Sequence, residues 1–465
     1  MNILIVGNGF DLSHYLPTKY DHFMVAMGAI ESWEEQKGEM RFDDLFGSLY
    51  EKENYFFKYT KAMYQTDEIK ISIEQVKELK QKLKENVWYQ YFSDHVREVK
   101  TWIDFEQKIE EALGYVSKLL SRIEEVYSKR NKLLLEIKAL EFNKFDKGSE
   151  YIYLNEKVCQ ALTNIGLIEK QFYTIKVSED GQREEVYVSE KTDHFYYLIN
   201  KDYIKDHKGY DLYNSDFCIL ILNESLSELI DIFNFYLLII DRFNLGKLIA
   251  QLSVEFKKVY SFNYTKTFEK FYKLNQIEFL HGNSGNTQNI VLGVSDLSND
   301  ILKKHKAYGF TKYHQKLFKD TDYLFLDNYK NIILNNKKEI VNLENQLKGE
   351  NRSAYRNDLM GKINNLSQLN KLKLNFYIWG HSLDVSDKDY IIDLFYFNNE
   401  IDQEVRITVY YFDKNAKFAL LNNLLDILGK EKVEIWMKNR WLKFQPNPNI
   451  AEINNIEPVA LPKFR

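Results

Sequence analysis

A chain of 465 residues is long enough for two or three domains, or for one domain that carries large insertions. Lys and Arg number 63 against 68 Asp and Glu, so the net charge of -5 gives no general reason to expect a nucleic-acid or anionic-membrane partner. Only two cysteines are present, without a spacing pattern, which argues against a disulfide framework or a cysteine zinc site.

The N-terminal residues lack the features of a secretory signal. No Lys or Arg precedes Lys19, and the opening apolar run is interrupted by Gly7, Asn8 and Asp11. The most apolar later stretch, Leu229 to Ile240, contains polar residues and is too short to span a bilayer. We therefore expect a cytoplasmic protein without a membrane partner.

The first predicted strand covers Leu4 to Val6 and runs directly into a glycine turn, Gly7-Asn8-Gly9. A short β-branched run of this kind is typical of a strand buried on both faces of a parallel sheet. Phe10 to His14 is expected to begin a helix, and strand, turn and helix together match the first unit of a Rossmann-like fold. We therefore predict nucleotide contacts from Gly7, Asn8, Gly9 and Phe10, although such turns also occur without a ligand.

Residues 31–251 are predicted to form a large, mainly helical insertion. Ile73 to Leu83 and Phe105 to Leu120 carry apolar residues at helical spacing. Ser225 to Ile240 is expected to be a further helix that begins with a capping box at Ser225. The alternating residues of Phe172 to Ser189 instead predict an accessory β-hairpin, with its turn at Asp180-Gly181.

Two carboxylates of this insertion, Asp104 and Glu106, have two interpretations. Thr101 precedes Asp104 at the spacing of a helix capping box, which is a structural role. The alternative is that the helical insertion delivers a carboxylate to a functional site.

Further short, apolar runs rich in β-branched and aromatic residues predict the rest of the sheet. They are Lys258 to Phe262, Ile277 to Leu280, Ile290 to Leu292, Leu374 to Trp379, Val405 to Phe412 and Val433 to Trp436. A helix is expected at Asn415 to Leu428, and the polar stretch of residues 319–372 is expected to be a protruding helical pair.

Four of the predicted strands end in a small cluster of Gly, Asn, His or Asp. The clusters are Gly7 to Asp11, Asn263 to Thr265, His281-Gly282 and Gly380 to Asp384. Each cluster alone can be explained as turn chemistry. The carboxyl ends of parallel strands, however, lie along one edge of a sheet, where ligands bind, so we expect the four clusters to meet there.

The motifs NILIVGNGFDL, WIDFE, SFNYTKTFEKFY and FLHG, in that order, resemble the AbiH-type abortive-infection family of phage-defence proteins. The later motifs are also similar, more distantly, to sirtuin-like NAD-consuming domains. In those domains the Asn of an NYD motif and the His of an HG motif form the catalytic pair. The resemblance therefore implies catalytic roles for Asn263 and His281, with NAD as a substrate and not as a redox cofactor.

Cleavage of a nicotinamide-ribose bond passes through a state that resembles an oxocarbenium ion, so the protein must orient the ribose and a water. Asn263 can hold that water or a ribose hydroxyl, and His281, with a pKa near neutrality, can remove a proton. Asp11 can hydrogen-bond the ribose or orient His281, or it can simply cap a helix. No metal is expected, because the histidines lack a ligand spacing such as HExxH.

The motif WGHSLDVSD is similar to a late glycine-serine-leucine-aspartate motif of the sirtuin-like domains. This resemblance implies nucleotide contacts from Gly380, His381, Ser382 and Asp384. The structural alternative is that Ser382 to Asp384 begins a helix.

Together these patterns predict an α/β fold with a Rossmann-like, sirtuin-like parallel sheet core drawn from residues 1–30, 252–318 and 373–465. The insertion at 31–251 and the arm at 319–372 would interrupt it. The leading functional hypothesis is an antiphage effector that hydrolyses NAD or a related nucleotide. The alternatives are a non-catalytic nucleotide-binding sensor, and a nuclease that binds a divalent metal through Asp11, Asp104 and Glu106. The insertions are candidate contacts for a homo-oligomer or for a partner protein of the defence system.

Overall fold

A six-stranded sheet, in which every pair of neighbours is parallel, organises the chain. The computed structural model describes residues 1–94, 102–130, 136–140, 152–177, 183–188, 191–192, 195–207, 210–245, 254–272, 277–321, 325–369, 373–400 and 404–463. The sheet has the order β12-β11-β1-β13-β14-β15. Its strands are β1 (Asn2–Val6), β11 (Lys258–Ser261), β12 (Ile277–Phe279), β13 (Lys373–Trp379), β14 (Glu404–Tyr411) and β15 (Leu442–Pro446).

The central strand, β1, is buried on both faces, as its composition predicts. Leu4 and Val6 belong to one hydrophobic core, which the sheet shares with the helices that follow β1 in the chain. Ile3 and Ile5 point to the other face and belong to a second core. Helices α15 (Lys388–Glu400), α16 (Lys414–Leu428) and α17 (Lys430–Lys438) supply the partners of that second core.

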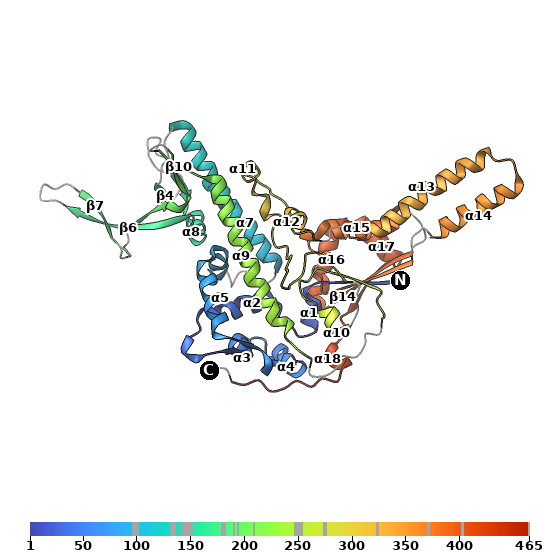
Figure 1. Cartoon of the computed structure of the whole chain (residues 1–465), viewed down its shortest axis with the longest axis horizontal. Helices are drawn as coiled ribbons and strands as arrows, with labels where there is room; N and C mark the ends of the chain where they lie inside the picture. Colours follow the sequence, from blue (N-terminus) through green and yellow to red (C-terminus); the bar gives the residue numbers. More distant parts are fainter. Residues whose placement is uncertain are drawn as a thin grey trace.

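The sheet therefore lies between two helical layers (Figure 1). The short helices near the sheet are α1 (Asn8–Ser13), α10 (Thr267–Tyr272) and α18 (Ile450–Ile453). Helix α11 (Asp300–Lys304) packs instead against the long helix α7, and α12 (Lys312–Phe318) follows it in the chain. Because Val6 pairs with both Ser261 and Trp379, three strands end at the same level and their following loops meet at one edge.

The insertion between β1 and β11 is built on long helices whose apolar faces join the first core. The expected helices at 73–83 and 105–120 are confirmed. The helices are α2 (Tyr20–Glu31), α3 (Phe42–Phe46), α4 (Asn54–Met63), α5 (Ile73–Glu85), α6 (Val87–Asp94), α7 (Trp102–Arg130), α8 (Glu156–Asn164) and α9 (Ser215–Asp241).

The capping box expected at Ser225 is wrong. The helix α9 begins ten residues earlier, where the Asn214 side chain accepts a hydrogen bond from the Phe217 amide, so Ser225 lies in the helix interior. Residues 215–224, SDFCILILNE, carry enough apolar side chains to extend the buried face of the helix. Their packing in the core outweighs the local capping signal at Ser225.

The insertion contains more β structure than the sequence predicts. The expected hairpin is present as β6 (Ile168–Val177) and β7 (Arg183–Val188), with its turn outside the described residues. It extends a five-stranded sheet of order β5-β4-β8-β6-β7. The other strands are β4 (Glu136–Leu140), β5 (Ile152–Asn155) and β8 (Phe195–Ile199), and separate two-stranded pairs are formed by β2 (Met40–Arg41) with β3 (Lys70–Ile71) and by β9 (Ile204–His207) with β10 (Tyr210–Tyr213).

Two of the predicted core strands are wrong. Ile290 to Leu292 is a buried loop, and Val433 to Trp436 lies inside helix α17. Val433 and Trp436 are three positions apart, so one helical face brings both into the second core. A run of four residues cannot separate helical from strand periodicity. The actual sixth strand, β15, is an edge strand that ends in Pro446, which an edge tolerates.

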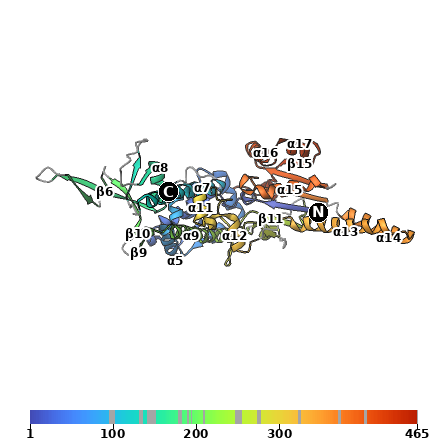
Figure 2. The ribbon, with the colours of Figure 1, turned by 90° about the horizontal axis from the view of Figure 1, so that it is seen from above.

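The expected helical pair is confirmed as α13 (Asp327–Gly349) and α14 (Ser353–Leu369). Both views of the molecule show this arm extending from one end, while the β6–β7 hairpin extends from the opposite end (Figures 1 and 2). In the part of the chain that the structure describes, no helix is both long and apolar enough to pass through a bilayer.

The loops after β1 and β13 lie in direct backbone contact, and glycine makes this possible. A Cβ atom on Gly7 would lie 2.6 Å from the Cα of His381, and one on Gly9 would lie 2.7 Å from the Cα of Gly380. Gly380 has a φ of +73°, and a Cβ there would lie 2.0 Å from the Phe10 nitrogen. The glycines therefore let two distant segments interlock at the carboxyl edge of the sheet.

Gly380→Ala should lower the free energy of unfolding by roughly 3 kcal/mol, because it adds a strained backbone conformation and a clash with backbone atoms. Urea or thermal unfolding followed by circular dichroism measures the change. Gly361→Ala is the matched control, since that glycine lies in α14 with no neighbour within 4 Å of its added methyl group. The control should be neutral or more stable by up to about 1 kcal/mol. Equal stability of the two variants would contradict the interlocking role of Gly380.

Candidate functional site

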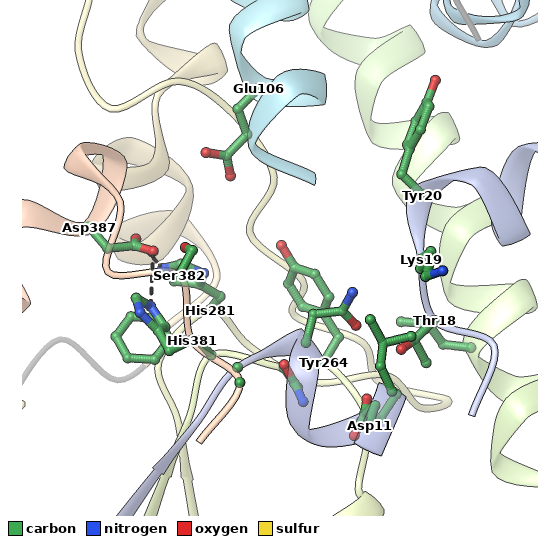
Figure 3. Close-up of a pocket in the computed structure, with 18 of the residues that line it drawn as sticks. Asp11, Thr18, Lys19, Tyr20, Glu106, Tyr264, His281, His381, Ser382 and Asp387 are labelled. Carbon is green, nitrogen blue, oxygen red and sulfur yellow. Dashed lines mark hydrogen bonds and ion pairs between the residues drawn. The ribbon is translucent and has the colours of Figure 1, made fainter. Parts of the chain in front are cut away.

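The four sequence clusters meet, as predicted, around one cavity of about 320 Å³ at the carboxyl edge of the parallel sheet. Figure 3 shows the cavity, with Asp387, Ser382 and the two histidines on one side and Asp11, Thr18 and Lys19 on the other. The predicted site residues that line it are Gly7, Asn8, Asp11, Asn263, His281, Gly380, His381 and Ser382.

Three predicted residues lie elsewhere. Phe10 is fully buried and packs edge-on against Trp379, with ring centroids 5.0 Å apart. Gly9 contacts Gly380 and faces a neighbouring groove. Asp384 caps the helical turn Val385–Asp387, which is the structural alternative to a nucleotide contact. Its side chain accepts a hydrogen bond from the Ser386 amide.

The glycine turn is not an open row of amides. The Gly7 amide donates to the Trp379 carbonyl at 3.1 Å, and the Gly9 amide donates to the Gly380 carbonyl at 2.8 Å. The nucleotide contacts predicted for Gly7 and Gly9 therefore cannot be amide hydrogen bonds, because the hydrogens of both amides already serve the contact between the two loops. Asn8 remains as the middle residue of the turn that lines the cavity.

A single carboxylate, Asp387, joins the histidines that follow two different strands. The Nε2 atom of His281 lies 3.2 Å from Oδ1 of Asp387, and Nε2 of His381 lies 3.4 Å from Oδ2. Nδ1 of His381 accepts a hydrogen bond from the Leu383 amide at 2.9 Å, so in the neutral ring the proton is on Nε2 and points to Asp387. The Phe262 ring lies against both imidazoles, with centroid distances of 5.2 Å to His281 and 4.1 Å to His381.

The environment of His281 keeps its ring neutral. Burial lowers the pKa of His281 to about 4, although the nearby Asp387 carboxylate opposes this shift. This corrects the expectation of a pKa near neutrality. At physiological pH the ring is therefore neutral and can accept a proton, but a pKa of about 4 makes it a weaker base than an ordinary histidine. Its 5% exposure shields it from bulk water.

The helical insertion reaches the same site through Glu106, as the second interpretation of that residue predicts. The Lys312 ammonium, at the start of α12, lies 2.8 Å from Oε2 of Glu106 and 3.5 Å from Oδ1 of Asp387. Figure 3 shows Glu106 extending from α7 toward the cavity. The side chain of Asp104, its partner in the prediction, lies outside the described residues.

The pKa values of the two carboxyl groups, Glu106 and Asp387, shift in opposite directions. Burial raises the pKa of Glu106 to about 7, and Lys312 opposes the rise. Burial alone would raise the pKa of Asp387, but Lys312 and His281 outweigh it and hold that pKa well below its usual range. Asp387 is therefore the permanent anion of the site.

On the other wall, Asp11 lies inside helix α1 and does not cap it, since the N-cap is Gly7. Its Oδ2 accepts a hydrogen bond from the Thr265 hydroxyl at 2.6 Å, while Oδ1 has no hydrogen-bond partner. The Nδ2 group of Asn263 is also buried without a partner. Burial raises the pKa of Asp11 to about 7, and the Thr265 hydrogen bond opposes the rise. The Asn263 side chain also lowers this pKa, so its amide lies close to the Asp11 carboxyl group, and together they offer a donor and an acceptor at this wall.

Sequence reasoning missed Asp387 and Lys312 as site residues. Asp387 is the last residue of the quoted motif WGHSLDVSD, so its position three residues after Asp384 was the available signal. Lys312 belongs to no motif, and only the fold brings it to Asp387. Among the described residues, no three His, Cys, Asp or Glu side chains are placed to hold a metal ion.

Comparison with known proteins identifies the family. The family model described as Bacteriophage abortive infection AbiH matches residues 3–411. The chain belongs to the AbiH family. Membership of AbiH indicates a role in abortive infection, a defence against bacteriophage. No curated protein and no solved structure matches this AbiH chain.

Asp11→Asn should make the protein more stable, with a gain that grows as the pH rises. The folded protein holds the Asp11 proton up to about pH 7, whereas the unfolded chain releases it near 3.8, so rising pH favours unfolding across this window. Asn removes this titration, and the gain should reach up to about 4 kcal/mol above pH 7 and vanish near pH 4. Thermal unfolding between pH 4 and 8 measures it, with the exposed Asp426→Asn as control. A gain that is independent of pH would contradict the buried, proton-holding carboxyl group.

Proposed function

We propose that this AbiH-family chain is a phage-defence effector that hydrolyses NAD, or a related nucleotide, at the bond between nicotinamide and ribose. The observation that carries the proposal is the convergence of Asn263, His281 and Asp11 on one cavity at the carboxyl edge of the parallel sheet. A cavity of about 320 Å³ is within the range of sites that bind small molecules.

The sheet supports the proposal that the core is Rossmann-like. Numbered in chain order, its strands lie in the order 3-2-1-4-5-6, which is the order of dinucleotide-binding folds. The order reverses between β1 and β13, and in open α/β sheets ligands bind at such a switch point. The loops after these two strands supply Gly7, Asn8 and Gly380 to Ser382 to the cavity.

The site residues can divide the work of hydrolysis. Water attacks the anomeric carbon of the ribose, the carbon-nitrogen bond breaks, and nicotinamide leaves as a neutral molecule. His281, neutral and buried, accepts the proton of the attacking water. The Nδ2 group of Asn263 donates a hydrogen bond that orients the ribose or the water, and Asp11 accepts one from a ribose hydroxyl.

Asp387 acts on the reaction through His281. After proton transfer the imidazolium lies beside a carboxylate at 3.2 Å, and this charge pair stabilises the protonated ring. Lys312 in turn balances Asp387, because its ammonium is shared between that carboxylate and Glu106. Asp387 and Lys312 are therefore positioning residues and not groups that contact the ribose.

Incubation of the purified full chain with NAD, followed by chromatography of released nicotinamide, tests the proposal. Asn263→Ala and His281→Ala should each reduce the rate by about 100-fold or more, because each removes a group that acts in the transition state. The matched controls are Asn286→Ala and His314→Ala, two exposed residues of the same types, which should keep the wild-type rate.

Absence of nicotinamide release by the wild type, together with NAD binding that survives His281→Ala, would overturn hydrolysis and favour a nucleotide sensor. Circular dichroism of each variant verifies that a lost rate does not reflect unfolding. Expression in phage-infected cells gives the second readout, since the catalytic variants should lose protection while the two controls retain it.

A further inference from the structure

A second and larger hollow adjoins the cavity. It has a volume of about 1040 Å³ and lies over the ends of β13, β14 and β15, against α1, α4 and α16. We call it the aromatic groove. It shares Leu12, Lys19 and the turn Gly380 to Ser382 with the cavity, so the two spaces are neighbours at this turn.

Aromatic rings are the main chemical feature of this groove. The rings that line it are Tyr15, Tyr55, Phe56, Tyr410, Tyr411 and Phe412. Phe412 is 80% exposed and Tyr55 is 63% exposed, so both present uncovered ring surface. Planar heterocycles such as nucleobases stack on faces of this kind.

The charges of the groove do not favour an anion. Its cations, Lys19 and Lys52, are each held by a carboxylate at 2.5 Å, Glu53 for the first and Asp21 for the second. A phosphate would have to compete with these carboxylates for the ammonium groups. The groove therefore suits an uncharged, planar group better than a phosphate chain.

The buried Oδ1 atom of Asn447, in the groove lining, indicates that the bound group should carry a hydrogen-bond donor. The Ser13 hydroxyl donates its hydrogen to the Gly9 carbonyl at 2.7 Å, so it can only accept from Asn447, at 3.3 Å. The amide of Asn447 must then direct Nδ2 to Ser13, which leaves Oδ1 on the other side. This Oδ1 is buried and has no hydrogen-bond partner, so a ligand that donates a hydrogen bond would satisfy it once the Asn447 side chain is uncovered.

We infer that the aromatic groove binds a nucleobase with an exocyclic amino group, of the adenine type. The base stacks at the rim formed by Phe412 and Tyr55, and its amino group donates toward Asn447. The inference rests on the proposed function, because it assigns this base to the far half of the nucleotide whose reacting half occupies the cavity. The ligand class is thus a dinucleotide that carries an amino-substituted base.

Isothermal titration of the full chain with AMP tests the inference without any catalytic step. IMP carries a carbonyl oxygen in place of the amino group of AMP, so it lacks that donor and should bind about 10-fold more weakly. Phe412→Ala should weaken AMP binding by about 10-fold through lost stacking. Phe318→Ala is the matched control, because that ring is equally exposed at 80% and lies on α12, outside the groove lining. Asn447→Ala should remove the preference for AMP over IMP.

Equal binding of AMP and IMP to the wild type would overturn the inference, and so would equal binding of AMP to the Phe412→Ala and Phe318→Ala variants. These results are independent of nicotinamide release. Discrimination between AMP and IMP without NAD cleavage would support the groove and refute the hydrolase. NAD cleavage that is unaffected by Phe412→Ala, with no AMP binding, would support the hydrolase and refute the groove.

Discussion

Direct backbone contact between the loops after β1 and β13 is the constraint on which the rest of the structure depends. Two amide hydrogen bonds join residues about 370 positions apart in the chain, from Gly7 to Trp379 and from Gly9 to Gly380. Because side chains are absent at the crossing, the two loops can approach closely enough for Asp11 and the histidine turn to border the same cavity. The glycines of the first motif therefore have a structural role in the site, which does not depend on contact with a ligand.

Charge compensation is the second organising principle. A buried carboxylate such as Asp387 is costly unless several cationic or donor groups surround it. The structure provides Lys312 from α12, His281 after β12 and His381 after β13, and each comes from a different part of the chain. The opposite wall has the converse property, because Asp11 and Asn263 keep polar atoms without partners. The satisfied cluster gives the site its rigidity, while the unsatisfied wall is where a polar ligand gains most.

Much of this arrangement could be predicted from short patterns. Buried β-branched runs identified the first strands, and the rule that parallel strands end at one edge brought Asn263 to His281. Patterns failed where the deciding contact is distant in sequence. Lys312 belongs to no sequence pattern, and only folding places it between the carboxylates of Glu106 and Asp387. Val433 to Trp436 is too short to show whether its apolar residues follow a helical or a strand periodicity. The five-stranded sheet of the insertion was missed because only its hairpin has a local turn signal.

Helix α7 has a mechanical consequence for the molecule. It is 29 residues long, about 43 Å, and its early residue Glu106 is a counterion of Lys312. Near its other end, Glu124 binds Lys304 at 2.7 Å and His305 at 2.8 Å, in the segment that leads into α12. Ion pairs near both ends of α7 thus connect the helix to the segment from Lys304 to Lys312. A displacement of the end of α7 that carries Glu124 would therefore also move Glu106 and change the ion pairs of Lys312 beside the two histidines.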